Sequence, residues 1–190
     1  MSRRLRANYL FVAAYALGSL GCSDPVHDHA VERLGPESDR GTGPLHRAGQ
    51  SCGTCHGQLG PARQDFAIAG TVFTSATSGV GASGATVELV DSRGSSPSSL
   101  QPIVTNCAGN FWVARSDWAP VFPVRVKIAK NGVERIMKTP IGGTSSCADC
   151  HEARISNPLA KLGAVAFVDG DGADAGANST PTCSVGLEVR

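Results

Sequence analysis

Between residues 66 and 137, the apolar and polar residues follow the pattern of short strands joined by turns. Apolar residues dominate 67–73, and in 85–91 they occupy every second position, with polar residues between them. Such alternation is typical of a strand that is buried on one face only. Further strands are predicted at 111–114 and 124–129, so this region predicts a β-rich body.

A hairpin is predicted at Asn131-Gly132, because both residue types accept a positive φ. Its return strand is expected at 133–137, and no segment shows a convincing helix of ten residues. Several short strands separated by turns favour a mainly β chain with a small antiparallel β-sandwich of prealbumin or Ig-like type, which we place at residues 66–140.

Three stretches carry a resemblance to a known family. They are Gly70-Thr71-Val72-Phe73, Gly84 to Asp91, and Gly109-Asn110-Phe111. This order of turns and strands resembles the carboxypeptidase regulatory-like domain, a prealbumin-type β-sandwich, over residues 66–138. The resemblance implies a structural or interaction module without catalytic residues.

The predicted sandwich lies between two copies of Cys-x-x-Cys-His, in segments expected at 51–65 and 141–158. The two pentads consist of Cys52, Cys55 and His56, and of Cys147, Cys150 and His151. This spacing is the attachment signature of c-type haem. Two thiols so spaced can add to the two vinyl groups of one porphyrin, and the following His is placed to bind the iron. The sequence therefore predicts two covalently attached haem c groups, each carried by a short helical or loop segment.

Two other uses of paired cysteines compete with haem. Zinc ribbons join two such pairs in one tetrahedral site, but their pairs are about 15–20 residues apart. Here 91 residues separate Cys55 from Cys147. A redox-active dithiol is the second rival, and neither rival needs a His after each second cysteine.

The first 21 residues are predicted to be a secretory signal. Arg3, Arg4 and Arg6 precede an apolar stretch at 10–17, which is shorter than the about 20 residues that a membrane-spanning helix needs. The segment before Cys22 resembles a bacterial lipoprotein signal, which implies a lipid on Cys22 and a membrane-anchored protein of the periplasm or cell surface, most simply at the outer membrane. Ser19-Leu20-Gly21 also fits an ordinary cleavage site, which would release a soluble exported protein.

Composition narrows the classes of partner. Loss of the signal removes three of the seventeen basic residues and none of the sixteen acidic ones, so the mature chain is slightly acidic. This balance gives no reason to expect nucleic-acid binding. We expect redox partner proteins, contact with a membrane through the anchor, and either a homo-oligomer or a larger cytochrome assembly.

Two cysteines remain after the lipid and haem assignments. Outside the cytoplasm a disulfide persists, so Cys107 and Cys183 are the expected pair. Two unrelated buried thiols are the alternative.

The function of the haems depends on what binds each iron on the side opposite His56 or His151. A second strong ligand keeps small molecules away from the iron, so electron transfer is the role that remains, whereas an open side permits catalysis. His46 is the first candidate, because it lies six residues before Cys52 and Gly49 lets the backbone pass close to a porphyrin. Met137 is the second candidate, with sandwich core as its alternative role. His27 and His29 are further candidates in the polar segment 22–50, which is predicted to be a tether.

The remaining predictions are less specific. Trp112, Trp118 and Phe122 are assigned to the core in preference to the haem pockets. A helical turn is expected at 152–155, and the C-terminal part, 159–190, holds strand candidates at 163–168 and 185–189 around a Gly- and Asp-rich loop. That loop departs from the EF-hand spacing, so we expect no calcium site.

These features favour electron transfer by an exported dihaem c-type cytochrome rather than catalysis. A dihaem enzyme such as a peroxidase would need an open iron and a positioned acid or base. The third class is a haem-bearing sensor or interaction lipoprotein.

Overall fold

The computed structural model describes residues 24–37, 42–97, 102–152 and 162–168. The chain divides into two units, 1–33 and 34–190, and each is considered by itself. The described residues of the first unit form helix α2 (Pro25–Arg33). Its N-cap is Asp24, whose carboxylate accepts hydrogen bonds from the backbone N–H groups of Val26 and His27. This helix lies within the predicted tether and was not foreseen from the sequence.

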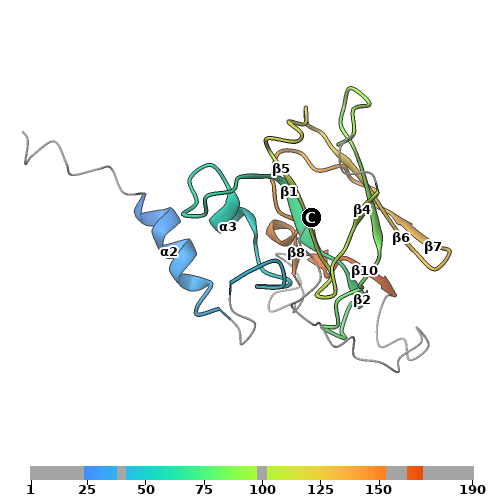
Figure 1. Ribbon diagram of the computed structural model, residues 1–190, viewed down its shortest axis with the longest axis horizontal. Coiled ribbons are helices and arrows are strands. Elements are labelled where there is room, and N and C mark those ends of the chain that lie inside the picture. Colours follow the sequence, from blue (N-terminus) through green and yellow to red (C-terminus); the bar gives the residue numbers. More distant parts are fainter. Residues whose placement is uncertain (1–23, 38–41, 98–101, 153–161, 169–190) are drawn as a thin grey trace, which may run out of the picture. The chain divides into compact units, whose positions relative to one another are not determined.

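The second unit is built mainly of strands, shown with their labels in Figure 1. Its main sheet has the order β4-β3-β6-β7, and β1 pairs with β5. All of these pairs are antiparallel. The bounds are β1 (Phe66–Thr71), β3 (Thr86–Val90), β4 (Ile103–Val104), β5 (Asn110–Ala114), β6 (Arg125–Lys130) and β7 (Val133–Ile136).

Two short pairs join later parts of the chain to this body. β2 (Phe73–Ser75) pairs in parallel with β10 (Ala166–Val168), and β8 (His151–Glu152) pairs in parallel with β9 (Leu162–Gly163). The first pair brings the segment after the second pentad back to the β body. The expectation of a mainly β chain is confirmed, and the specific sandwich family stays a prediction.

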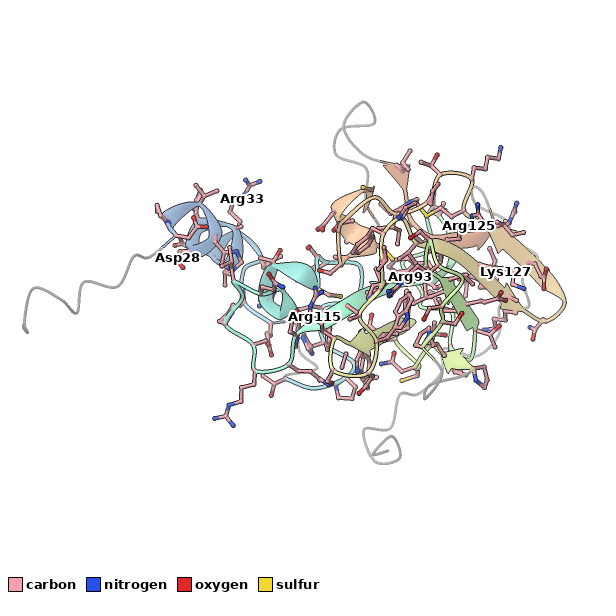
Figure 2. All side chains as sticks on the ribbon, turned by 90° about the horizontal axis from the view of Figure 1, so that it is seen from above. Asp28, Arg33, Arg93, Arg115, Arg125 and Lys127 are labelled. Atoms are coloured by element: carbon pink, nitrogen blue, oxygen red, sulfur yellow. The ribbon has the colours of Figure 1, made fainter. Side chains whose placement is uncertain are left out.

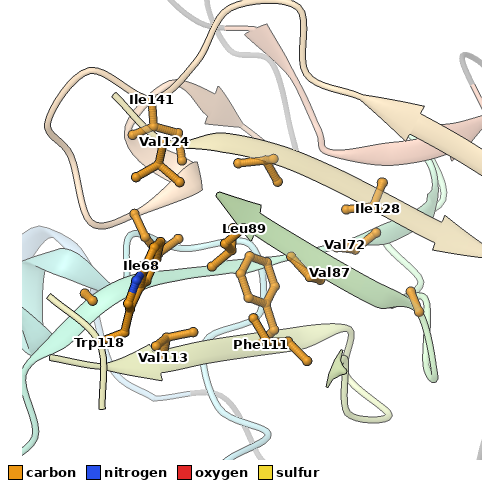
Figure 3. Packing of buried hydrophobic residues seen from close by; sticks show 14 of the residues in the cluster. Ile68, Val72, Val87, Leu89, Phe111, Val113, Trp118, Val124, Ile128 and Ile141 are labelled. Atoms are coloured by element: carbon orange, nitrogen blue, oxygen red, sulfur yellow. The ribbon is translucent and has the colours of Figure 1, made fainter. Parts of the chain in front are cut away.

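One apolar cluster joins β1 and β5 to β3 and β6, as Figure 3 shows. Ile68 and Val113 come from the first pair of strands, and Val87, Leu89 and Ile128 come from the main sheet. In β3, Thr86 and Glu88 are exposed while Val87 and Leu89 are buried. The alternation seen in the sequence therefore gave the correct buried face.

The predicted hairpin is also confirmed. Asn131 and Gly132 have φ values of 50° and 79°, and they connect β6 to β7 with Lys130 opposite Val133. A positive φ at both turn positions matches the twist of the flanking strands.

Charged side chains project from the outside of the β body, among them Arg115, Arg125 and Lys127 in Figure 2. Lys127 Nζ lies 2.6 Å from a Glu88 carboxylate oxygen, and this hydrogen bond raises the pKa of the lysine. Arg115 pairs with Asp65 at 2.8 Å. Such exposed pairs contribute little to stability, so the apolar cluster carries the fold.

Several predicted features lie outside the described residues: the signal at 1–21, the lipidation candidate Cys22, the loop at 169–174, the strand at 185–189, and Cys183. The helical turn predicted at 152–155 lies outside them except for Glu152, which belongs to β8. In the part of the chain that is described, no helix has the length and apolar character needed to cross a bilayer.

Candidate functional site

The two pentads lie against each other although 91 residues separate Cys55 from Cys147. The backbone N–H of Cys52 donates a hydrogen bond of 3.1 Å to Ser146 Oγ. Ser51 Oγ donates one of 2.6 Å to the Asp149 carboxylate. We call these two facing segments, residues 51–53 and 144–149, the seam.

Strand β1 positions the second half of the seam. Its Ala69 N–H donates a 2.7 Å hydrogen bond to the Ser145 carbonyl, and Ala69 forms a parallel bridge with Ser146. Gly70 makes this approach possible. A Cβ atom at Gly70 would lie 2.5 Å from Cys147 Sγ and 2.8 Å from Cys147 Cβ. The absence of a side chain at this strand position therefore lets Cys147 pack directly on the sheet.

The first pentad forms the short helix α3 (Gly53–His56), in which the His56 N–H bonds the Cys52 carbonyl at 2.8 Å. The His56 ring stacks on Phe66, with centroids 4.0 Å apart and planes 9° from parallel. Its Nδ1 lies 2.8 Å from the Gln64 carbonyl. A carbonyl only accepts, so Nδ1 carries the proton and Nε2 keeps its lone pair for a metal.

The second pentad has a different local structure, but its histidine makes the same kind of Nδ1 hydrogen bond to a backbone carbonyl. Cys147–Asp149 form the 3-10 helix η2, and His151 begins β8. His151 Nδ1 lies 2.8 Å from the Gly163 carbonyl in β9. Here too the carbonyl acceptor fixes the proton on Nδ1 and leaves Nε2 able to bind a metal.

Each pentad opens into its own cavity. The Cys52 pocket, of about 390 Å³, is lined by Cys52, Cys55, His56, His46 and Trp112 among others. The Cys147 pocket, of about 400 Å³, is lined by Cys147, Cys150, His151, Met137 and several aliphatic side chains. Both volumes fall within the range of cofactor sites. Phe111 lines both pockets.

His46 lies in the Cys52 pocket with His56, and their ring centroids are 6.0 Å apart. Two imidazoles on opposite sides of one metal have centroids roughly 6 Å apart, because each metal–nitrogen bond is about 2 Å and each nitrogen lies about 1 Å from its ring centre. His46 Nδ1 contacts the Gly43 carbonyl. Its Nε2 is therefore also the nitrogen with a free lone pair.

Buried polar residues of the β body hold the backbone around His46. Asn110 Nδ2 donates to the His46 carbonyl at 3.0 Å, and Asn106 Nδ2 donates to the Pro44 carbonyl at 2.6 Å. Thr71 Oγ1 donates to Asn110 Oδ1 at 2.7 Å. Sequence reasoning missed these positioning residues. Its only signal was the Gly109-Asn110 turn.

Met137 is among the residues that line the Cys147 pocket. It follows β7, its N–H bonds the Val126 carbonyl at 3.0 Å, and its half-buried side chain also packs against the core. The structure therefore groups His46 with the first pentad and Met137 with the second. His27 and His29 lie on α2 in the other unit, where His29 pairs with Glu32 at 3.7 Å.

The aromatic residues divide between the two roles considered for them. Trp112 lines the Cys52 pocket, whereas Trp118 belongs to the core and Phe122 packs against that core. Cys107 is in a disulfide, and its predicted partner Cys183 lies outside the described residues. The pairing of Cys107 with Cys183 therefore stays a prediction.

Cys52, Cys55, Cys147 and Cys150 are free thiols. Burial raises the pKa of Cys147 to about 12, with the neighbouring Cys52 and Asp149 adding to the rise. Burial likewise raises the pKa of Cys52 to about 11, and Asp149 again contributes. Both thiols are therefore protonated near neutral pH in this structure.

Among the described residues, no three His, Cys, Asp or Glu side chains converge on a point where a metal ion would bind directly. Comparison with protein-family models, curated proteins and solved structures finds no match to this chain. The function is therefore argued from the two pockets themselves.

Proposed function

We propose that this protein transfers electrons as an exported dihaem c-type cytochrome. The observation that carries the proposal is the content of the two pockets. Each holds one complete Cys-x-x-Cys-His pentad together with a second side chain able to bind iron, His46 in one and Met137 in the other.

The residues present fit a haem c in each pocket. The two cysteines of each pentad would form the thioethers, and Nε2 of His56 or His151 would bind the iron, held in position by the Nδ1 hydrogen bond to a backbone carbonyl. Haem c supplies a one-electron change at its iron. The chain contributes attachment, axial ligands and an apolar enclosure, which together set the reduction potential.

The placement of the four thiols favours haem over zinc. A zinc ribbon directs both cysteine pairs at one ion, about 2.3 Å from each sulfur. Here Cys52 and Cys55 line one cavity while Cys147 and Cys150 line another. A porphyrin needs such a volume beside each pair, and a tetrathiolate zinc site does not.

We also propose the finer features of the molecule. The core shared by β1, β5, β3 and β6 is compatible with a prealbumin-type sandwich carrying a haem segment at each end. The basic and apolar pattern of residues 1–21, followed by Cys22, favours a lipid anchor outside the cytoplasm. Redox partner proteins would then be met at the membrane surface.

Haem content provides the first test. The protein, made together with a c-type haem attachment machinery, is expected to give two haems c per chain in a pyridine haemochrome assay. Zinc in place of haem would refute the proposal. Electron transfer with two ligands per iron predicts low-spin spectra that carbon monoxide leaves unchanged. A high-spin fraction that binds carbon monoxide would indicate an enzyme or a sensor instead.

Substitution tests the ligand assignment. His46→Ala is expected to convert one of the two haems to high spin, because His46 shares the pocket with His56. Met137→Ala is expected to change the other haem. The matched control is His29→Ala, on the exposed helix α2. If His29→Ala produces the high-spin signal and His46→Ala does not, the assignment is wrong.

A further inference from the structure

The structure assigns Asp149 a role that neither pentad signature specifies: it is a shared positioning residue whose carboxylate lowers the reduction potentials of both haems together. This inference rests on the proposed function. The two pentad signatures describe independent haem sites, and this inference adds a residue that both sites share.

The hydrogen bonds of Asp149 connect the two pockets. One carboxylate oxygen accepts from Ser51, which lines the Cys52 pocket, and the other accepts from Thr144, which lines the Cys147 pocket. Asp149 itself lies between Cys147 and Cys150. The carboxylate is therefore held by one hydrogen-bond donor from each haem site. Ser51 and Asp149 are 98 positions apart in the sequence.

A second contact runs parallel to this one. Ser146 is buried, lines the Cys147 pocket, and accepts the Cys52 backbone N–H at 3.1 Å. The attachment segments therefore cannot shift independently while the seam is closed. The negative charge of Asp149 also acts on one thiol of each pentad, because it contributes to the raised pKa of Cys52 and of Cys147.

The sign of the effect follows from electrostatics. A negative charge favours the ferric state, which carries one more positive charge than the ferrous state, so it lowers the potential of each nearby haem. Because one carboxylate lies beside both attachment segments, it acts on both in the same direction. Asp149 is exposed, so dissolved salt should weaken its influence.

If both pockets held haem, exchange across the seam would move one electron from the ferrous iron of one haem to the ferric iron of the other, with no bond or proton changing place. A redox partner protein would supply the first electron, and a second partner would accept it.

Redox titration of the haem-loaded chain tests the role of Asp149. Asp149→Asn keeps the size of the side chain and removes its charge, and it is expected to raise both midpoint potentials. The rise should shrink as ionic strength increases. Asp117→Asn is the matched control, because it removes an exposed carboxylate that accepts its hydrogen bond from the neighbouring Ser116 and not from a pentad segment, and it should leave both potentials unchanged.

Ser51→Ala separates charge from position. It removes one hydrogen bond to Asp149 but keeps the carboxylate, so both potentials should stay closer to those of the unaltered protein than in Asp149→Asn. The inference is overturned if Asp149→Asn shifts only one potential or neither, or if Ser51→Ala matches it in size. Failure of the proposed function looks different, since no haem c would then be attached at all.

Discussion

At the scale of single residues, the reactivity of the Cys52 and Cys147 thiols depends on their burial in the folded chain. Cys52 and Cys147 have pKa values raised to about 11 and about 12 from a usual value of 9.0, because burial disfavours the thiolate. A thiolate is the nucleophile that a cysteine offers to another group. The folded, haem-free chain therefore presents both thiols in their unreactive form.

This shift predicts how the stability of the haem-free chain depends on pH. Below pH 9 the contribution of the two thiols is fully present, since they are protonated whether the chain is folded or unfolded. Above pH 9 the unfolded chain loses these protons first. The free energy of unfolding should then fall by up to about 1.4 kcal/mol per pH unit for each thiol until the folded-state pKa is reached.

Urea unfolding between pH 8 and pH 11 measures this fall. The comparison is a haem-free variant carrying Cys52→Ala and Cys147→Ala, in which the fall should be smaller because two titrating groups are gone. Equal pH dependence in both proteins would contradict the assigned shifts. In the haem-loaded protein the fall in unfolding free energy that the two thiols cause should be absent, because thioether sulfurs have no proton to lose.

At the scale of elements, β1 connects the apolar core to the haem segments. Ile68 packs in the core while Ala69 bonds Ser145 and Gly70 faces Cys147. The run of apolar residues at 67–73 identified the strand. It could not identify Gly70 as a contact point, because that role depends on a segment almost eighty residues later in the chain.

Gly70→Ala tests this contact. The added methyl group would lie within 3 Å of Cys147, so overpacking should cost about 1–3 kcal/mol of unfolding free energy. Gly143→Ala is the matched control, because no atom lies within 4 Å of the added Cβ. Denaturant unfolding of both variants measures the difference. A neutral Gly70→Ala would show that Cys147 does not need this position.

For the whole molecule, the sequence predicted the candidate residues of the site but not how they are brought together. Both pentads, His46 and Met137 were identified from residue type and spacing. Which candidate belongs with which pentad was not, because the pairing depends on how β1, β5 and β7 place segments that are distant in sequence. Asn110, Ser146 and Asp149 were missed for the same reason, since polar residues at turns carry no signature of their own.

Because both pentads are bonded to one β body, the haem sites should be lost together with the fold. Residues 34–190 form one unit, in which β1 contacts both pentad segments: Ala69 bonds Ser145, and Phe66 stacks on His56. The haem-loaded protein should therefore unfold in one transition, with equal midpoints by Soret-band and far-ultraviolet circular dichroism. Separate midpoints would indicate haem segments that unfold independently of the strands.

The contact between Ser51 and Asp149 also orders events in time. Asp149 is made 93 residues after His56, the last residue of the first pentad, which at about 5–20 residues per second takes roughly 5–20 s. For that interval the first pentad exists without the carboxylate that accepts the Ser51 hydrogen bond, so its half of the seam stays open. The seam can therefore close only after all the strands from β1 to β7 have been made.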